Sequence, residues 1–125
     1  MSDTVPVLIV DDQAPFRRAA RAVVTATPGF EVVGEAESGE EAVQMFDALR
    51  PGLVLMDINL PGINGIEATR RITSAHPAAV VMLLSTYQMG DLPADAHGCG
   101  AAAYVHKEEF GPTLVQDVWS KRATA

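Results

Sequence analysis

Short apolar runs that alternate with helical patterns constrain the fold of this 125-residue chain more than any other feature. Residues 7–10, 53–56 and 80–84 are apolar without interruption, which predicts strands that are buried on both faces. Residues 30–34 and 102–105 predict two further strands, the first of them more exposed. Burial of this kind is typical of a parallel sheet that carries helices on both faces. We therefore expect an α/β fold with a doubly wound, five-stranded parallel sheet.

The segments between these strands carry helical patterns with recognisable ends. Pro15 lies at the first turn of one pattern, a capping box begins at Ser38, and Asn64 caps a helix that runs to about residue 75. Residues 90–100 are a poor helix former, because a proline and a glycine interrupt them. Residues 108–122 predict a last helix. The order of the elements is therefore a series of β-α units.

Composition and charge limit the function classes that remain. A chain of this length forms one domain, which we place at residues 1–125. With 16 acidic and 9 basic residues its net charge is −7, so the domain would repel phosphate backbones and we expect no direct nucleic-acid binding. Cys99 is the only cysteine, which excludes an internal disulfide and fits a reducing compartment. No apolar run is long enough for a signal peptide or membrane span, so we expect a cytoplasmic protein with no membrane partner.

Polar residues follow the predicted strands at the point where each strand ends. In doubly wound sheets ligands bind at this carboxyl edge. The residues that the rule selects are Asp11, Asp12, Asp57, Ser85, Thr86 and Lys107. A single acid at a strand end is often a solvated carboxylate or a helix cap, but that reading weakens when three acids gather at one edge.

Three neighbouring carboxylates repel one another, and a hard cation with oxygen ligands, Mg²⁺, relieves the repulsion. A carboxylate beside Mg²⁺ is able to accept a phosphoryl group and form an acyl phosphate. Phosphoryl transfer depends on positioning and charge neutralisation, to which a hydroxyl and a lysine ammonium contribute. Ser85 and Lys107 have the chemistry and the predicted positions for these contacts.

Four segments together resemble one known family over the whole chain. They are Val-Asp-Asp at 10–12, Leu-Met-Asp-Ile-Asn-Leu-Pro-Gly-Ile-Asn-Gly at 55–65, Leu-Leu-Ser-Thr at 83–86 and Tyr-Val-His-Lys at 104–107. Their order and spacing resemble the receiver domain of two-component response regulators, the CheY-like family, which has a flavodoxin-like fold. The sequence of residues 58–69 looks most like that of NarL/LuxR-type regulators, which usually continue into a helix-turn-helix DNA-binding domain.

The resemblance implies a role for each matching residue at the acidic edge. Asp57 would be the phosphoacceptor for a sensor histidine kinase. Asp12, Asp57 and the backbone carbonyl of Asn59 would ligate Mg²⁺ directly, and Asp11 would act through water. Lys107 would contact the phosphoryl group.

The resemblance also implies a switch and a contact surface. Ser85 would be the switch hydroxyl, Tyr104 the aromatic that responds to it, and Thr86 a residue that lines the site. A homodimer would use the face formed by the helix within residues 90–100, the fifth strand and the last helix. That helix carries Pro93 and an unusual glycine-rich end, so its role departs from the family pattern.

Two other functions compete with this interpretation. A Mg²⁺-dependent phosphohydrolase with Asp57 as nucleophile would need a second acid nearby, and Asn59 occupies the obvious position. A flavodoxin-like cofactor module would need a hydroxyl-rich phosphate loop after the first strand, and the sequence has none there. We expect a signalling domain and not an enzyme.

Overall fold

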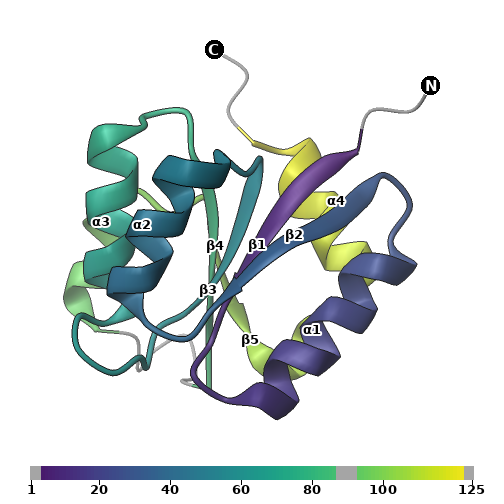
Figure 1. Ribbon diagram of the computed structural model, residues 1–125, viewed down its shortest axis with the longest axis horizontal. Helices are drawn as coiled ribbons and strands as arrows, with labels where there is room; N and C mark the ends of the chain where they lie inside the picture. The colour runs from purple at the N-terminus through teal and green to yellow at the C-terminus, as the bar shows by residue number, and fades with distance from the viewer. Residues whose placement is uncertain (1–3, 87–92, 123–125) are drawn as a thin grey trace.

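The computed structural model describes residues 4–86 and 93–122, and it contains the predicted parallel sheet (Figure 1). The strand order is β2-β1-β3-β4-β5, which is the doubly wound order with a switch beside β1. The strands are β1 (Val5–Val10), β2 (Phe30–Ala36), β3 (Leu53–Asp57), β4 (Val80–Ser85) and β5 (Ala103–His106). The fold class that the sequence predicts is confirmed.

Helices cover both faces of this sheet. Figure 1 shows α2 and α3 together on one face and α1 and α4 on the other. The helices are α1 (Ala14–Ala26), α2 (Gly39–Leu49), α3 (Gly65–Ala75) and α4 (Pro112–Ser120), and short 3₁₀ helices span Ala94–Gly98 and Lys107–Glu109. Within residues 4–86 and 93–122, none of the helices has the length and apolarity that crossing a membrane requires.

The core has two layers, because successive residues of a strand point to opposite faces. Leu8 and Val54 belong to the layer under α2 and α3, whereas Val7, Ile9 and Leu55 belong to the layer under α1 and α4. All five are fully buried. The double burial explains why the central strands are apolar throughout, as a parallel sheet requires.

The predicted helix caps are formed. Ser38 Oγ accepts a hydrogen bond of 3.1 Å from the backbone N–H of Glu41, and Asn64 Oδ1 accepts one of 2.9 Å from Glu67. The carboxylate of Glu41 accepts at 2.7 Å from the backbone N–H of Glu37. Each cap satisfies N–H groups that a helix leaves unpaired at its first turn.

The last helix begins later than the sequence predicts. Residues 108–111 do not belong to it, and α4 starts at Pro112. Gly111 is extended, with φ −170° and ψ 178°, and Phe110 is extended as well. A residue before proline is disfavoured in the α conformation, so Pro112 starts the helix and the preceding turn stays separate. The fifth strand also lies one residue further on than predicted.

The segment from 90 to 100 forms no α-helix in its described part. Ala94–Gly98 is a 3₁₀ helix, while residues 87–92 lie outside the described residues. The hydroxyl of Tyr104 donates to the carbonyl oxygen of Ala96 at 2.7 Å, and Cys99 is buried as a small side chain. The helix that the predicted homodimer face includes is therefore replaced, over the described residues, by one short turn.

Candidate functional site

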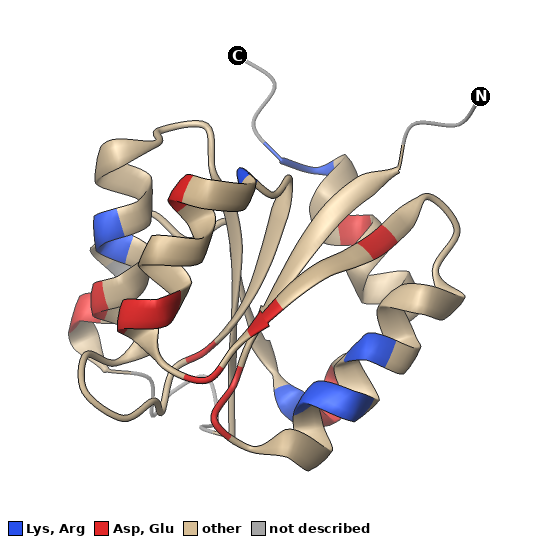
Figure 2. Ribbon diagram, in the orientation of Figure 1, with Lys and Arg blue, Asp and Glu red and all other residues tan. Residues whose placement is uncertain are grey.

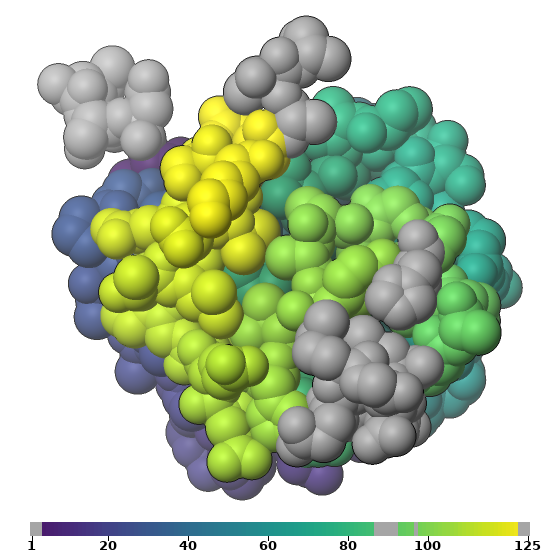
Figure 3. Space-filling view, turned by 180° about the vertical axis from the view of Figure 1, so that it is seen from behind, coloured from purple at the N-terminus to yellow at the C-terminus, as the bar shows by residue number. Residues whose placement is uncertain are grey.

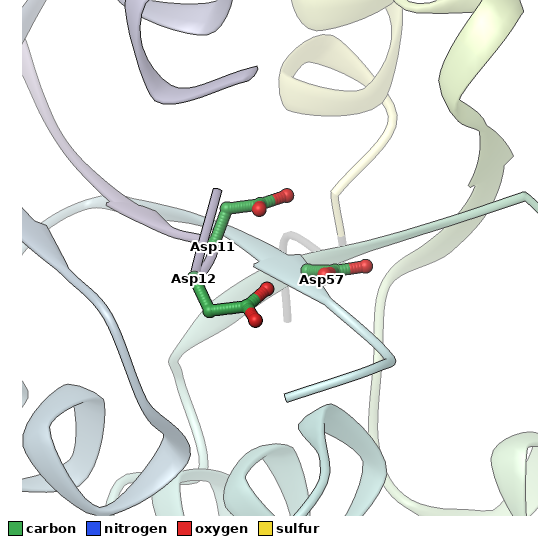
Figure 4. A group of neighbouring side chains, drawn as sticks. All are labelled: Asp11, Asp12 and Asp57. Carbon is green, nitrogen blue, oxygen red and sulfur yellow. The ribbon is translucent and has the colours of Figure 1, made fainter. Parts of the chain in front are cut away.

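The register of the sheet brings the acidic residues together at its carboxyl edge. Val10 pairs with Met56 in the next strand, so the residues that follow β1 lie beside the end of β3. Figure 2 shows acidic positions gathered at this edge, and Figure 4 shows the side chains of Asp11, Asp12 and Asp57 near one another there. Oxygen atoms of the three carboxylates lie within 4.8 Å of one another.

Asp11 is the fully buried member of this group. Its Oδ2 atom is 2.8 Å from Lys107 Nζ, and its Oδ1 atom accepts a 2.8 Å hydrogen bond from the backbone N–H of Gln13. Lys107 Nζ also lies 4.4 Å from the ring centroid of Phe16, a cation–π contact. The ion pair and the amide together compensate for burying the charge of Asp11.

Asp57 ends β3 and is 4% exposed. Burial raises its pKa to about 6, the neighbouring charge of Asp11 adds to the rise, and Lys107 opposes it. Lys107 Nζ lies 3.4 Å from Asp57 Oδ1, which also accepts a 3.4 Å hydrogen bond from the backbone N–H of Asn59. Lys107 thus bridges two carboxylates, but it is closer to Asp11 than to Asp57.

A small cavity opens beside Asp57. Its volume is about 260 Å³, and its lining residues are Asp12, Gln13, Asp57, Asn59, Thr86 and Lys107. Asp12 is exposed, in contrast to Asp11 and Asp57. Carboxylate oxygens and an ammonium group in the lining of one cavity suit a hydrated divalent cation together with a phosphoryl group. The donor set present therefore fits Mg²⁺.

The sequence-predicted residues divide into three groups by position. Five of them line the cavity: Asp12, Asp57, Asn59, Thr86 and Lys107. Asp11 is fully buried and contacts Lys107, while Ser85 is 3% exposed at the end of β4. Tyr104 does not line the cavity, but it shares a sheet face with Ser85, because Leu83 pairs with Tyr104 and Ser85 with His106.

Two residues at the site were not identified from the sequence. Gln13 lines the cavity and also supplies the backbone N–H to Asp11. Arg17 donates from its guanidinium to the backbone carbonyl of Asp11 at 2.7 Å and pairs with Glu35 at 3.3 Å. The position of Gln13 directly after two acids and before a helix was a usable signal. The contact of Arg17 with Asp11 depends on the tertiary structure.

Comparison with known proteins agrees with this geometry. The profile of the response regulator receiver domain matches residues 7–118. Response regulator GacA of Pseudomonas viridiflava is 37% identical over 112 residues, which are 90% of this chain and 52% of GacA. The chain belongs to the response regulator receiver domain family.

Solved structures show the same fold. A LuxR-family two-component response regulator from Aurantimonas sp. SI85-9A1 is 34% identical, with a TM-score of 0.85 and coverage of 96% of this chain and 88% of that one. A CheX–CheY–BeF₃–Mg²⁺ complex from Borrelia burgdorferi matches with 28% identity and a TM-score of 0.84, covering 94% of this chain and 89% of that one. The molecule is thus a receiver domain of the two-component type, with LuxR-family neighbours.

The relatives differ in what accompanies the receiver domain. The chain spans about half the length of the first curated relatives it matches. A protein-glutamate methylesterase from Idiomarina loihiensis is 38% identical over 106 residues, which are 84% of this chain and 28% of the esterase. Receiver domains are generally signalling domains that work with histidine kinases and output domains, and some of their relatives are enzymes.

Proposed function

We propose that Asp57 accepts a phosphoryl group from a sensor histidine kinase and that the modification changes the affinity of the domain for a partner. The observation that carries the proposal is the arrangement around Asp57: a buried carboxylate with a second carboxylate beside it and a lysine that bridges both. The raised pKa of about 6 shows that its charged form is poorly compensated. A bound cation would supply the missing compensation.

Mg²⁺ fits the acidic edge and, when bound, would neutralise the charge that phosphoryl transfer concentrates there. Asp12, Asp57 and the backbone carbonyl of Asn59 would hold it directly, and Asp11 would act through water. The exposure of Asp12 supports a direct ligand role, because an exposed carboxylate retains room for a hydrated ion. The pairing of Asp11 with Lys107 supports its more distant role.

In the transfer step one Asp57 oxygen forms a bond to phosphorus. The P–N bond of the donor phosphohistidine breaks, and the imidazole nitrogen keeps the electron pair. Lys107 follows the new charge and contacts a phosphoryl oxygen, for which it is positioned 3.4 Å from Asp57 Oδ1. Thr86 lines the cavity on the side of β4 and would limit the access of water to the acyl phosphate.

Ser85 and Tyr104 would transmit the change. The Ser85 hydroxyl would turn toward the phosphoryl group, and the Tyr104 ring would move into the space beside it on the same sheet face. The surface that would respond consists of the 3₁₀ helix at Ala94–Gly98, β5 and α4, and we propose it as the homodimer face.

The remaining assignments follow from the same role. We propose residues 1–125 as one receiver domain that works in the cytoplasm and belongs to, or is related to, a NarL/LuxR-type transcriptional regulator. In such a regulator nucleic-acid binding would lie outside this acidic domain.

Labelling with a small phosphodonor tests the proposal. With Mg²⁺ and acetyl phosphate, intact-mass measurement should show one added phosphoryl group that survives acid and is lost in base. D57N should show none, because an amide is a poor nucleophile, whereas D47N, which changes an exposed acid at the far end of α2, should be labelled like the wild type. Full labelling of D57N, or sustained release of phosphate with many turnovers, would overturn the assignment.

A further inference from the structure

A large groove lies at the amino edge of the sheet, opposite the acidic site. It measures about 1270 Å³ and runs between α4 and the turns that lead into β4 and β5. Figure 3 shows this face hollowed between the yellow α4 and the green residues that precede β5. The acidic site lies at the other ends of the strands, so the groove is a separate feature.

The groove stays open because most of one wall consists of small residues. Residues 78–79 and 101–103 are all alanine, and Gly100 precedes the second of these runs. Larger apolar groups come from the other side, where Leu114 and Trp119 of α4 line it. A stripe of alanines alone would be only a shallow surface, but here it faces an indole ring.

Cations gather at the rim of this apolar groove. Arg50, Lys121 and Arg122 line it, together with the carboxylate of Asp117, in a chain whose net charge is −7. Lys121 lies 4.0 Å from Asp117, a weak contact, whereas Arg50 and Arg122 have no carboxylate partner among the described residues. Arg122 lies over the Trp119 ring, 3.8 Å from its centroid, so charge and apolar surface meet at one point.

Arg50 adds an independent observation from the backbone. It caps α2 with φ 48° and ψ 58°, and it is the only non-glycine residue with positive φ in the described chain. Glycine is the usual residue at such a cap, because a Cβ atom makes the left-handed conformation costly. Arg50 adopts the left-handed conformation although it carries a Cβ atom. Its exposed guanidinium lies at the rim, where Nε donates only to the backbone carbonyl of Asp47, at 3.2 Å.

We propose that this groove binds an amphipathic organic anion, a small molecule with a flat apolar body and one carboxylate or sulfonate group. The apolar body would lie against Trp119 and the alanine wall, and the anionic group would pair with the arginines of the rim. The apolar floor and a rim with three cations to one carboxylate are complementary to such an anion. The inference goes beyond the proposed phosphoacceptor role and stands or fails separately, because the two sites occupy opposite edges of the sheet.

Two naphthalene probes of matched body test the site in the absence of a phosphodonor. Trp119 is the only tryptophan, so its indole N–H gives a single cross-peak in a ¹H–¹⁵N spectrum. We expect 2-naphthoate to shift this peak with saturation and a Kd below about 1 mM, and neutral 2-naphthylmethanol to bind about tenfold more weakly. An unmoved Trp119 peak, or equal affinity for both probes, would overturn the proposal.

Substitutions separate binding from folding. R50G should weaken 2-naphthoate binding about three- to tenfold while raising the Tm by about 2–4 °C, because it relieves the left-handed cap. R122K should keep most of the affinity for 2-naphthoate, and R122Q should lose it. Arg18 is exposed on α1 away from the groove, so R18Q serves as the control and should change neither this affinity nor the Tm. Unchanged 2-naphthoate binding in both R50G and R122Q would show that these arginines do not pair with the anionic group of the ligand.

Discussion

Asp57 is held in an environment that disfavours its own charge. It is buried beside Asp11, and its pKa rises to about 6 from an ordinary value of 3.8. Protonation of Asp57 therefore favours the folded state. Its contribution to stability is present below pH 4 and is lost as the pH rises toward 6 and beyond, and the difference amounts to about 3 kcal/mol. The other interactions of the fold must therefore offset the stability that is lost when Asp57 is charged.

Replacing Asp57 by asparagine should stabilise the metal-free protein. At pH 7.5 we expect D57N to raise the free energy of unfolding in urea by up to about 3 kcal/mol, because the unfavourable buried charge is removed. At pH 4 the gain should shrink toward zero, since Asp57 of the wild type is then largely protonated when folded. A gain that is equal at both pH values would show that the charge of Asp57 is not its cause.

The two acids that follow β1 should differ in their effect on metal affinity. Asp12 is exposed at the cavity and Asp11 is paired with Lys107, so D12A should weaken Mg²⁺ binding about tenfold more than D11A. Titration calorimetry of both variants provides the measurement. Equal losses in the two would rule out the division between a direct and a water-mediated role.

At the scale of elements, the loop between β3 and α3 is tied to a helix that is distant in sequence. Glu40 of α2 accepts a hydrogen bond of 3.1 Å from the backbone N–H of Ile63. Backbone N–H groups, its own and that of Ile63, hold the pKa of Glu40 below its usual value. Gly62 has φ +72°, and a Cβ atom there would clash with the Glu40 carboxylate. This anchor fixes the loop that begins at Asn59.

Weakening the hydrogen bond between Glu40 and the backbone N–H of Ile63 should lower the affinity for Mg²⁺. We expect E40Q to weaken Mg²⁺ affinity about two- to threefold with little change in Tm, because Glu40 is exposed and its role is to position the loop. E37Q, an exposed acid just before the same helix with no side-chain partner among the described contacts, serves as the control and should behave like the wild type. Identical Mg²⁺ affinity in E40Q and wild type would show that Glu40 does not position the metal-binding loop.

Local patterns predicted most elements because the strands are buried on both faces and the caps depend on neighbouring residues. Ser38 and Asn64 cap as the sequence indicates. The start of α4 was missed because the apolar spacing continues through residues 108–111 while Pro112 forces the preceding backbone out of the helix. At the site, the acids and Lys107 followed from their positions after strands. The anchor at Glu40 joins residues 23 apart, which no local pattern records.

Across the whole molecule, the sheet connects the acidic edge to the surface around Tyr104. Ser85 and Tyr104 lie on the same face of the sheet. The hydroxyl of Tyr104 donates a hydrogen bond to the carbonyl oxygen of Ala96, in the short 3₁₀ helix. A hydrogen bond from Ser85 to a phosphoryl oxygen contributes about 1.5–3 kcal/mol. That is enough to shift a two-state population about tenfold to a hundredfold.

S85A should separate phosphorylation from this response. The variant should still be labelled, because Asp57 and Lys107 remain, but it should lack the change around Tyr104 and Ala96. NMR spectra of wild type and S85A with Mg²⁺ and beryllofluoride provide the comparison, and T86A is the control that keeps the Ser85 hydroxyl. The full wild-type shift pattern around Tyr104 in S85A would show that no such coupling exists.

The position of the acyl phosphate tests the proposed role of Asp57 most directly. Borohydride reduces an aspartyl phosphate to homoserine, so peptide mass spectrometry of reduced, acetyl phosphate-treated protein identifies the modified residue. We expect homoserine at position 57 alone, and only when Mg²⁺ is present. Homoserine at position 11 or 12, or unmodified aspartate at 57 in labelled protein, would contradict it.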